Sequence, residues 1–259
     1  MAESIPRRIW KVIYPALLLV VIYLVVYFIA AQIYGIFFKD SYAGLEEFMN
    51  DRGSVASIAA LVAGGLAGFW LYKKEIVVTS ARITKKPVYF LWVAVLGALA
   101  SHGLGMVVSF INVTGILGTY SQVAAELSAG GLVLTAVKSV ILAPLTEELI
   151  FRGITFYRGR IYFGFWPAAV VSSVLFAVYH MNLMQGVYAF LYGILLCLVY
   201  ACFENLWATI AMHAAANLCS LLIQLSGLEY TSYLGAALVC ALCLAAGTAI
   251  YFLVLKKKD

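Results

Sequence analysis

Apolar runs of about 20 residues or more follow one another along almost the whole chain. The first covers residues 12–38, and comparable runs recur as far as residue 255. A helix needs about 20 mostly apolar residues to cross the hydrocarbon core of a bilayer. Because 64% of the 259 residues are hydrophobic and only 11% are charged, the apolar surface exceeds what one soluble core can bury. The sequence therefore predicts an integral membrane protein.

These runs predict an all-α fold, a polytopic helical bundle of about eight transmembrane helices that forms a single membrane domain over residues 1–259. The alternating pattern of an outer-membrane β-barrel is absent, and no hydrophilic block is long enough for a separate soluble domain. A polar connection is expected at residues 39–52, where acidic side chains gather. The expected helices are residues 12–38, 54–72, 88–111, 127–158, 167–181, 186–203, 205–225 and 232–255.

Basic residues predict how the bundle is oriented. The connection after the second expected helix is the most basic of the chain, and cytoplasmic connections are enriched in Lys and Arg. Eight crossings then place both termini in the cytoplasm, with the protein in the plasma membrane of a bacterial source or the endoplasmic reticulum of a eukaryotic one. The net charge of +5 accordingly indicates contact with the lipid bilayer rather than with nucleic acid. The basic residues concerned are Arg7, Arg8, Lys11, Lys73, Lys74, Arg82, Lys85, Lys86, Arg158, Arg160, Lys256, Lys257 and Lys258.

Three charged residues gather at residues 147–152, inside the apolar stretch of residues 132–156. Glu147, Glu148 and Arg152 are costly inside a bilayer, so their presence indicates a functional site. Arg152 follows Glu148 by four residues, which places the two side chains on one helical face, where they can pair. Glu147 points about 100° away around the helix and is expected to face a cavity as a base. This arrangement requires the helix to continue beyond Arg152 toward Arg158.

Two histidines are expected to complete the site. His180 follows Phe176 by four residues and His213 precedes Asn217 by four, so each pair shares a helical face. A rise of about 1.5 Å per residue puts these groups and Glu147 at compatible depths. Each group alone could instead serve in hydrogen bonding between helices, which is the better interpretation of Asn217 taken by itself.

The three spacings together resemble a known family. Glu-Glu-x-x-x-Arg at 147–152, Phe-x-x-x-His at 176–180 and His-x-x-x-Asn at 213–217 are similar, in the same order, to the motifs of the CPBP family. That family comprises CAAX proteases and bacteriocin-processing enzymes, is also called Abi, and includes the type II CAAX prenyl endopeptidases. The resemblance covers about residues 127–225, a core preceded by three expected helices and followed by one.

The resemblance implies an intramembrane endopeptidase of the glutamate type, acting on a membrane-associated peptide or a lipidated protein. A glutamate and a histidine would activate a water molecule, a second histidine and an asparagine would stabilise the oxyanion, and further residues would support them. By position these are Glu147 and His180, His213 and Asn217, and the supporting residues Glu148, Arg152 and Phe176.

No cofactor is favoured, although zinc has a credible ligand set. Glu147, His180 and His213 could hold zinc with an open position for water. However, the sequence lacks the His-Glu-x-x-His helix that brings two ligands together in many metalloproteases. Two further ionisable residues, Lys138 and His102, match no motif, and structural roles are expected for both.

Two other functional classes are open on the sequence alone. Buried ionisable residues also occur in transporters of small solutes or protons, although inverted repeats with interrupted helices are not evident. A non-catalytic membrane scaffold or an immunity protein would retain the same residues without hydrolysing anything. Peptide hydrolysis that disappears when Glu147 and His180 are replaced would select the protease.

Overall fold

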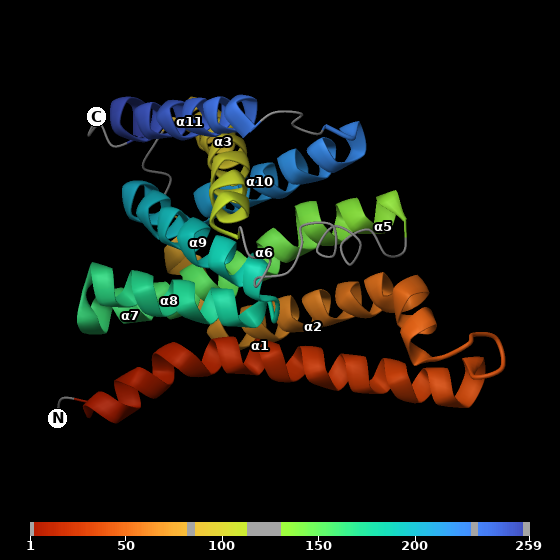
Figure 1. Ribbon diagram of the computed structural model, residues 1–259. Helices are drawn as coiled ribbons and strands as arrows, with labels where there is room; N and C mark the ends of the chain where they lie inside the picture. The colour runs from red at the N-terminus through yellow and green to blue at the C-terminus, as the bar shows by residue number, and fades with distance from the viewer. Residues whose placement is uncertain (1–2, 82–85, 113–130, 229–232, 256–259) are drawn as a thin grey trace.

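The computed structural model describes residues 3–81, 86–112, 131–228 and 233–255, and every regular element within these ranges is helical (Figure 1). The expected all-α fold is confirmed for this part of the chain. Segments labelled η are π-helical, with wider turns than an α-helix. The elements are α1 (Ile5–Ile33), η1 (Tyr34–Phe38), α2 (Leu45–Ala81), α3 (Val88–Ile111), α5 (Leu132–Ala136), η2 (Val137–Leu142), α6 (Ala143–Ile150), η3 (Phe151–Phe156), α7 (Tyr157–Phe163), α8 (Phe165–Tyr179), α9 (Leu183–Phe203), α10 (Leu206–Ser226), α11 (Tyr233–Ile250) and η4 (Tyr251–Leu255).

Within the described ranges, six helices are long and apolar enough to cross a membrane, and the protein is an integral membrane protein. The expected count of eight is not confirmed. One reason is that α8 has only 15 residues, and the other is that short α and π segments divide the path through Glu147. The six spans are Ile5–Phe38, Leu45–Glu75, Val88–Ile111, Leu183–Phe203, Leu206–Ser226 and Leu234–Leu253.

Two helices begin earlier than the apolar pattern indicates. α1 begins at Ile5, with a proline in its first turn, where the missing N–H costs no helical hydrogen bond. α2 begins at Leu45, so the polar connection expected at residues 39–52 is wrong in its second half. Two glutamates lie in the first turn of α2, where carboxylates interact favourably with the helix dipole. Polar residues at the helix start therefore extend α2 beyond its apolar run.

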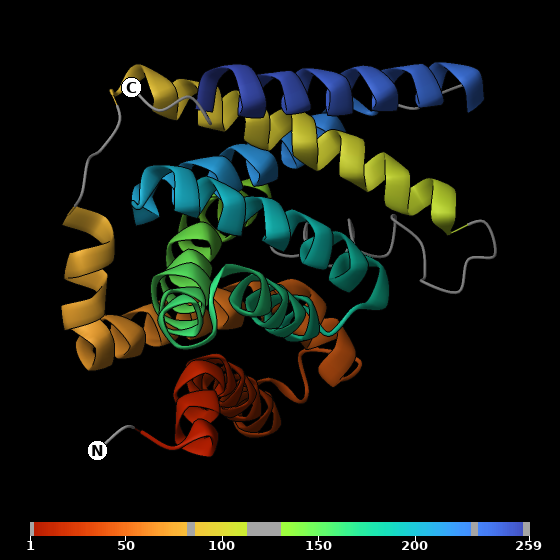
Figure 2. The ribbon, with the colours of Figure 1, turned by 90° about the vertical axis from the view of Figure 1, so that its left-hand side faces the viewer.

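A kink at Tyr72 divides α2. The backbone there is non-helical, with φ −123° and ψ 21°, and the chain then continues as a helix to Ala81. This last part of α2 runs across one end of the bundle (Figure 2). The start of the expected basic connection is therefore helical. Its centre at residues 82–85 lies outside the described residues, as do residues 113–130, which include most of the expected outer connection and the expected start of the fourth helix.

The helices form layers around the motif-bearing segment. α1 and α2 pack together on one side of the bundle, α3 and α11 pack on the opposite side, and α5 to α10 lie between them (Figure 1). The first turn of α1 and the last turn of η4 lie at the same end of the bundle. α3 crosses α10 at very short range, since a Cβ on Gly97 would lie 2.3 Å from the carbonyl oxygen of Met212. The two backbones can approach this closely only because residue 97 is a glycine.

The helical path through the charged motif is continuous from Leu132 to Phe163. Its predicted continuation beyond Arg152 is confirmed. Near its end, Arg158 donates one hydrogen bond to the carbonyl oxygen of Lys11 at 3.0 Å and another to the Glu75 carboxylate at 2.6 Å. These contacts join α7 to α1 and to the part of α2 beyond the kink, and so fix one end of the helix that carries the motif.

Candidate active site

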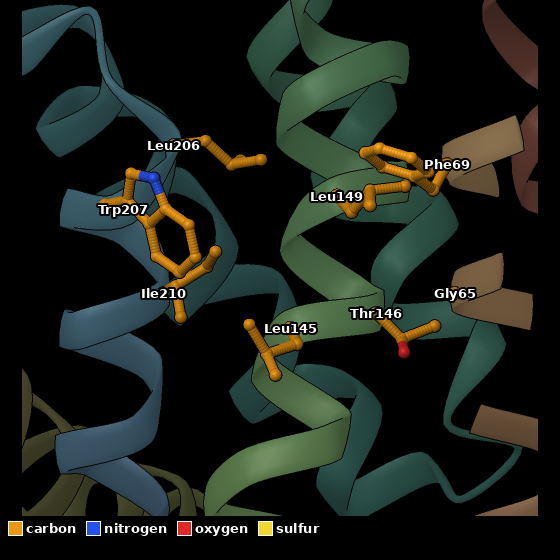
Figure 3. Close-up of a pocket in the computed structure, with 8 residues that line it drawn as sticks. All are labelled: Gly65, Phe69, Leu145, Thr146, Leu149, Leu206, Trp207 and Ile210. Carbon is orange, nitrogen blue, oxygen red and sulfur yellow. The ribbon is translucent and has the colours of Figure 1, made fainter. Parts of the chain in front are cut away.

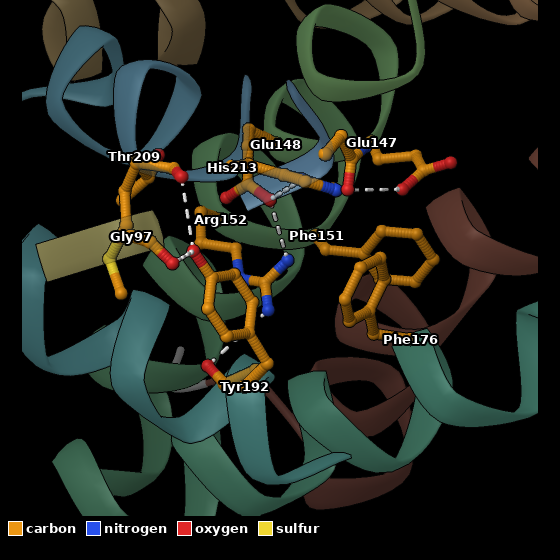
Figure 4. Close-up of polar contacts among 12 residues, drawn as sticks. Gly97, Glu147, Glu148, Phe151, Arg152, Phe176, Tyr192, Thr209 and His213 are labelled. Atoms are coloured by element: carbon orange, nitrogen blue, oxygen red, sulfur yellow. Dashed lines mark hydrogen bonds and ion pairs between the residues drawn. The ribbon is translucent and has the colours of Figure 1, made fainter. Parts of the chain in front are cut away.

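Glu148 and Arg152 form a fully buried ion pair at the junction of α6 and η3. The distance from Arg152 Nη1 to Glu148 Oε1 is 2.9 Å, and both side chains are 0% exposed. Arg152 Nη2 also donates to the carbonyl oxygen of Gly193 at 3.3 Å, and the guanidinium carbon lies 4.4 Å from the centre of the Phe176 ring. The pairing predicted from the four-residue spacing is confirmed (Figure 4). Arg152 Nε and Glu148 Oε2 are buried without a hydrogen-bond partner.

His213 of α10 lies between the two carboxylates. Its Nδ1 is 2.8 Å from Glu148 Oε1, and its Nε2 is 3.8 Å from Glu147 Oε2. Since the Glu148 carboxylate, paired with Arg152, accepts hydrogen bonds and cannot donate them, Nδ1 must be the donor to it. This contact fixes the ring so that Nε2 faces Glu147. Arg152, Glu148, His213 and Glu147 thus form one chain of charged and polar contacts (Figure 4).

Phe176 is the common neighbour of both histidines. Its ring centre is 4.7 Å from that of His180 and 5.8 Å from that of His213, and both contacts are close to perpendicular. His180 Nδ1 lies 2.7 Å from the Phe176 carbonyl oxygen. A carbonyl oxygen only accepts, so Nδ1 of His180 is the donor, and in the neutral ring Nε2 is left as an acceptor. Phe176 therefore contacts both histidines with its ring, and His180 also with its backbone.

The turn after α8 determines where His180 lies. α8 ends at Tyr179, two residues before the expected end of the helix, and His180 follows as its cap. Met181 then takes a left-handed backbone conformation with φ 55°. Asn182 caps α9, because its side chain accepts a hydrogen bond from the Gln185 N–H at 3.0 Å. His180 is thus held at a sharp turn between two packed helices.

Asn217 lies one helical turn beyond His213 on α10, as its spacing predicts. Its side-chain amide donates to the carbonyl oxygen of Ser139 at 2.7 Å. Ser139 belongs to the π-helical segment η2. The contact joins α10 to the helix that carries Glu147, which is the interhelical hydrogen bond considered for Asn217 alone. The oxyanion role of Asn217 stays a prediction.

The described residues do not form a metal site. In the ranges that the structure covers, no group of three or more His, Cys, Asp or Glu side chains has the arrangement needed to hold a metal ion. Zinc binding by Glu147, His180 and His213 stays an untested alternative. Lys138, on η2, is buried and donates to the Ser54 hydroxyl at 3.4 Å, and His102 lies half-buried on α3.

A mostly apolar pocket lies beside the turn that carries Glu147. It has a volume of about 320 Å³ and lies between α2, α6 and α10 (Figure 3). Thr146, which directly precedes Glu147, lines the pocket and donates its hydroxyl proton to the Leu61 carbonyl oxygen at 2.9 Å. The lining residues are Gly65, Phe69, Leu145, Thr146, Leu149, Leu206, Trp207 and Ile210.

The part of the chain that contains this site matches a known family. Residues 129–219 match the model described as "Type II CAAX prenyl endopeptidase Rce1-like". We refer to residues 129–219 as the Rce1-like segment. All three motifs lie within it, and the resemblance to type II CAAX prenyl endopeptidases that the motifs predict is confirmed.

Two bacterial relatives match the chain over a similar length. An Escherichia coli protein named "Uncharacterized 24.3 kDa protein" is 32% identical over 103 residues, which is 38% of this chain and 48% of the relative. A Bacillus subtilis (strain 168) protein named "Putative membrane peptidase YdiL" is 32% identical over 94 residues, 36% of this chain and 38% of the relative. The chain thus spans less than half the length of either relative. No solved structure matches it.

The Rce1-like segment also contains site contacts that the motif analysis missed. Gly193 of α9 contacts Arg152. Tyr192, also of α9, contacts the backbone next to His213. Neither residue belongs to a motif, and a tyrosine or glycine in an apolar helix is more often a packing residue. The sequence offers one signal for Tyr192, because a tyrosine hydroxyl inside a membrane needs a hydrogen-bond partner.

Proposed function

We propose that the protein is an intramembrane endopeptidase of the glutamate type that hydrolyses a peptide bond in a membrane-associated peptide or lipidated protein. The observation that carries the proposal is the buried chain of contacts from Arg152 through Glu148 and His213 to Glu147, which lies inside the Rce1-like segment. In this proposal both termini face the cytoplasm, and no cofactor is required.

The first step is attack by water on the carbonyl carbon of the substrate. Glu147 removes one proton from the water, and Nε2 of His180 accepts a hydrogen bond from the other, which orients the oxygen. The remaining hydroxide forms a bond to the carbonyl carbon while the carbonyl oxygen becomes an oxyanion. Burial favours this chemistry because electrostatic interactions with the developing charge are stronger where bulk water is excluded.

Stabilisation of the oxyanion falls to His213. With Nδ1 donating to Glu148, Nε2 faces the space next to Glu147. The role requires that Nε2 also carry a proton, which the ring then donates in a hydrogen bond to the oxyanion. Asn217 could add a second donor, because its amide nitrogen carries another N–H besides the one donated to the Ser139 carbonyl. When the carbon–nitrogen bond breaks, Glu147 returns its proton to the leaving nitrogen, which yields a carboxylic acid and an amine. The atoms of one water molecule are thereby divided between the two products.

The test uses purified protein in vesicles with a fluorogenic peptide carrying a lipid anchor. We expect hydrolysis in the wild type and none above background in Glu147→Gln or His180→Ala. His102→Ala is the matched control, since it removes a histidine of α3 that is outside the three motifs, and it should retain activity. Hydrolysis that persists in both site variants would exclude the proposed roles. A wild type that binds but never cleaves the peptide would favour the scaffold alternative.

The natural substrate can be sought by comparing membrane-associated peptides from cells that carry the wild type or Glu147→Gln. A fragment that requires the intact glutamate identifies a substrate and its cleavage site. Pairing the anchored fluorogenic peptide with the same peptide lacking its lipid then measures what the anchor contributes. Equal turnover of both would contradict the expectation that substrates are held in the membrane.

A further inference from the structure

α9 carries none of the three motifs, yet two consecutive residues of it reach both halves of the site. Tyr192 is buried, at 1% exposure, and Gly193 is buried beside it. Tyr192 contacts the chain next to His213, and Gly193 contacts Arg152. The close-up of the polar contacts shows the Tyr192 ring directed toward the region where α10 and α3 meet (Figure 4).

The Tyr192 hydroxyl fixes the backbone that carries His213. It donates to the carbonyl oxygen of Met212 at 3.0 Å, and the carbonyl oxygen of Gly97 lies 3.5 Å away. Met212 directly precedes His213 in α10. The hydroxyl therefore sits where α10 crosses α3 at its shortest range, and a shift of α10 would break this hydrogen bond. Because His213 contacts two carboxylates with opposite ring nitrogens, such a shift would disturb both contacts.

The Tyr192 ring is itself held in place by its neighbour. It stacks on Tyr188 with ring centres 5.6 Å apart and an interplanar angle of 12°. The stacking does not involve the Tyr188 hydroxyl, which donates to Ser101 Oγ of α3 at 3.0 Å. The Tyr192 ring centre lies 6.4 Å from the His213 ring. Tyr192 thus acts through the Met212 carbonyl and touches no reacting atom.

Gly193 leaves the space that the buried guanidinium occupies. A Cβ at this position would lie 3.0 Å from Arg152 Nη2 and 2.8 Å from Ser173 Oγ. The Gly193 carbonyl oxygen accepts a hydrogen bond from the same Arg152 Nη2 at 3.3 Å. A side chain at residue 193 would push Arg152 away from Glu148, and Glu148 would then no longer orient His213.

We infer that Tyr192 and Gly193 are positioning residues of the proposed active site, Tyr192 for His213 through the Met212 carbonyl and Gly193 for Glu148 through Arg152. The inference rests on the proposed function where activity is the readout. The part of the inference that concerns the orientation of the His213 ring can also be tested in an inactive variant of the protein.

The test removes only the hydroxyl, in Tyr192→Phe. We expect kcat to fall by about tenfold to a hundredfold, because small displacements of a reacting group have effects of this size, while KM changes by less than about twofold. Tyr188→Phe is the matched control, since it removes the hydroxyl of the stacked neighbour whose partner is Ser101, and it should leave kcat within about twofold of the wild type. Equal losses in the two variants would mean general packing and would overturn the inference.

The imidazole nitrogen signals of His213, measured by nuclear magnetic resonance on ¹⁵N-histidine protein, report the geometry without activity. In the Glu147→Gln background we expect Tyr192→Phe to shift the His213 Nδ1 signal and Tyr188→Phe to leave it in place. An unmoved His213 signal in Tyr192→Phe would overturn the positioning role. If the wild type hydrolyses no peptide but Tyr192→Phe still shifts the His213 signal, the proposed function is rejected and the positioning role of Tyr192 stands.

Gly193→Ala is tested together with Ser173→Ala. The double variant removes the hydroxyl that the added methyl group would meet at 2.8 Å. It keeps the contacts of that methyl group with Arg152 Nη2 and with the Cβ of residue 173, each at 3.0 Å. We expect activity to stay low in the double variant, and the Ser173→Ala variant alone to stay active. Recovery of activity in the double variant would attribute the loss to packing against Ser173 and would overturn the role of Gly193. If Gly193→Ala alone does not accumulate, the activity of the double variant and its His213 signal still test the role of Gly193.

Discussion

Replacing Glu148 by glutamine should destabilise the protein far more than the same replacement at Glu147. The two residues are neighbours on α6 and both are buried. Glu148 accepts hydrogen bonds from Arg152 at 2.9 Å and from His213 at 2.8 Å. The Glu147 carboxylate is 3.8 Å from His213, which is longer than a hydrogen bond. The same chemical change therefore removes very different contacts at the two positions.

The free energy of unfolding should fall by about 3 to 5 kcal/mol in Glu148→Gln. A hydrogen bond to a charged group contributes about 1.5 to 3 kcal/mol, and the charge is lost from two such bonds at once. Removing one partner of a buried ion pair costs a similar amount, because the Arg152 charge is left without compensation. In Glu147→Gln the loss should be less than about 1 kcal/mol, since no direct hydrogen bond is removed.

Both variants are unfolded with denaturant in the same detergent micelles, and tryptophan fluorescence reports the unfolded fraction. Adding Arg152→Met to Glu148→Gln should recover part of the stability, because the uncompensated charge is then also removed. Equal destabilisation by the two glutamine substitutions would refute the reasoning, as would a double variant no more stable than Glu148→Gln. Since no peptide is cleaved in this assay, its outcome is independent of the proposed function.

Three further outcomes are expected. Gly97→Ala should lower the free energy of unfolding by about 1 to 3 kcal/mol, because the added Cβ would clash with the Met212 carbonyl. Gly105→Ala is the control and should not destabilise α3, since nothing lies within 4 Å of the added Cβ. Equal effects of the two substitutions in thermal unfolding would contradict this prediction. Asn205→Ala should cost about 1 kcal/mol, because its side chain accepts from the Trp207 N–H at 2.8 Å, with peptide hydrolysis retained. Hydrolysis should also persist after chelation, and activity restored only by added zinc would contradict the metal-free proposal.

The sequence by itself determined the membrane class, most of the helices and the partners within one helix. The third helix, expected at residues 88–111, is found at Val88–Ile111, and the helix expected at residues 205–225 is found at Leu206–Ser226. The Glu148–Arg152 pair followed from a four-residue spacing. These features depend on local periodicity and on the length of apolar runs, which the backbone repeat translates directly into structure.

Only the tertiary structure decided which side chains of different helices meet. It brings His213 to Glu148 and Glu147, and it directs the Asn217 amide to a backbone carbonyl of η2. Spacing within a helix gives the face on which a residue lies, but not the rotation and depth of that helix against its neighbours. Those are set by contacts between distant segments, above all the close approach of Gly97 to Met212 and the Tyr192 hydroxyl beside it. No pattern in a single apolar helix records such a contact, because it depends on how two helices pack together.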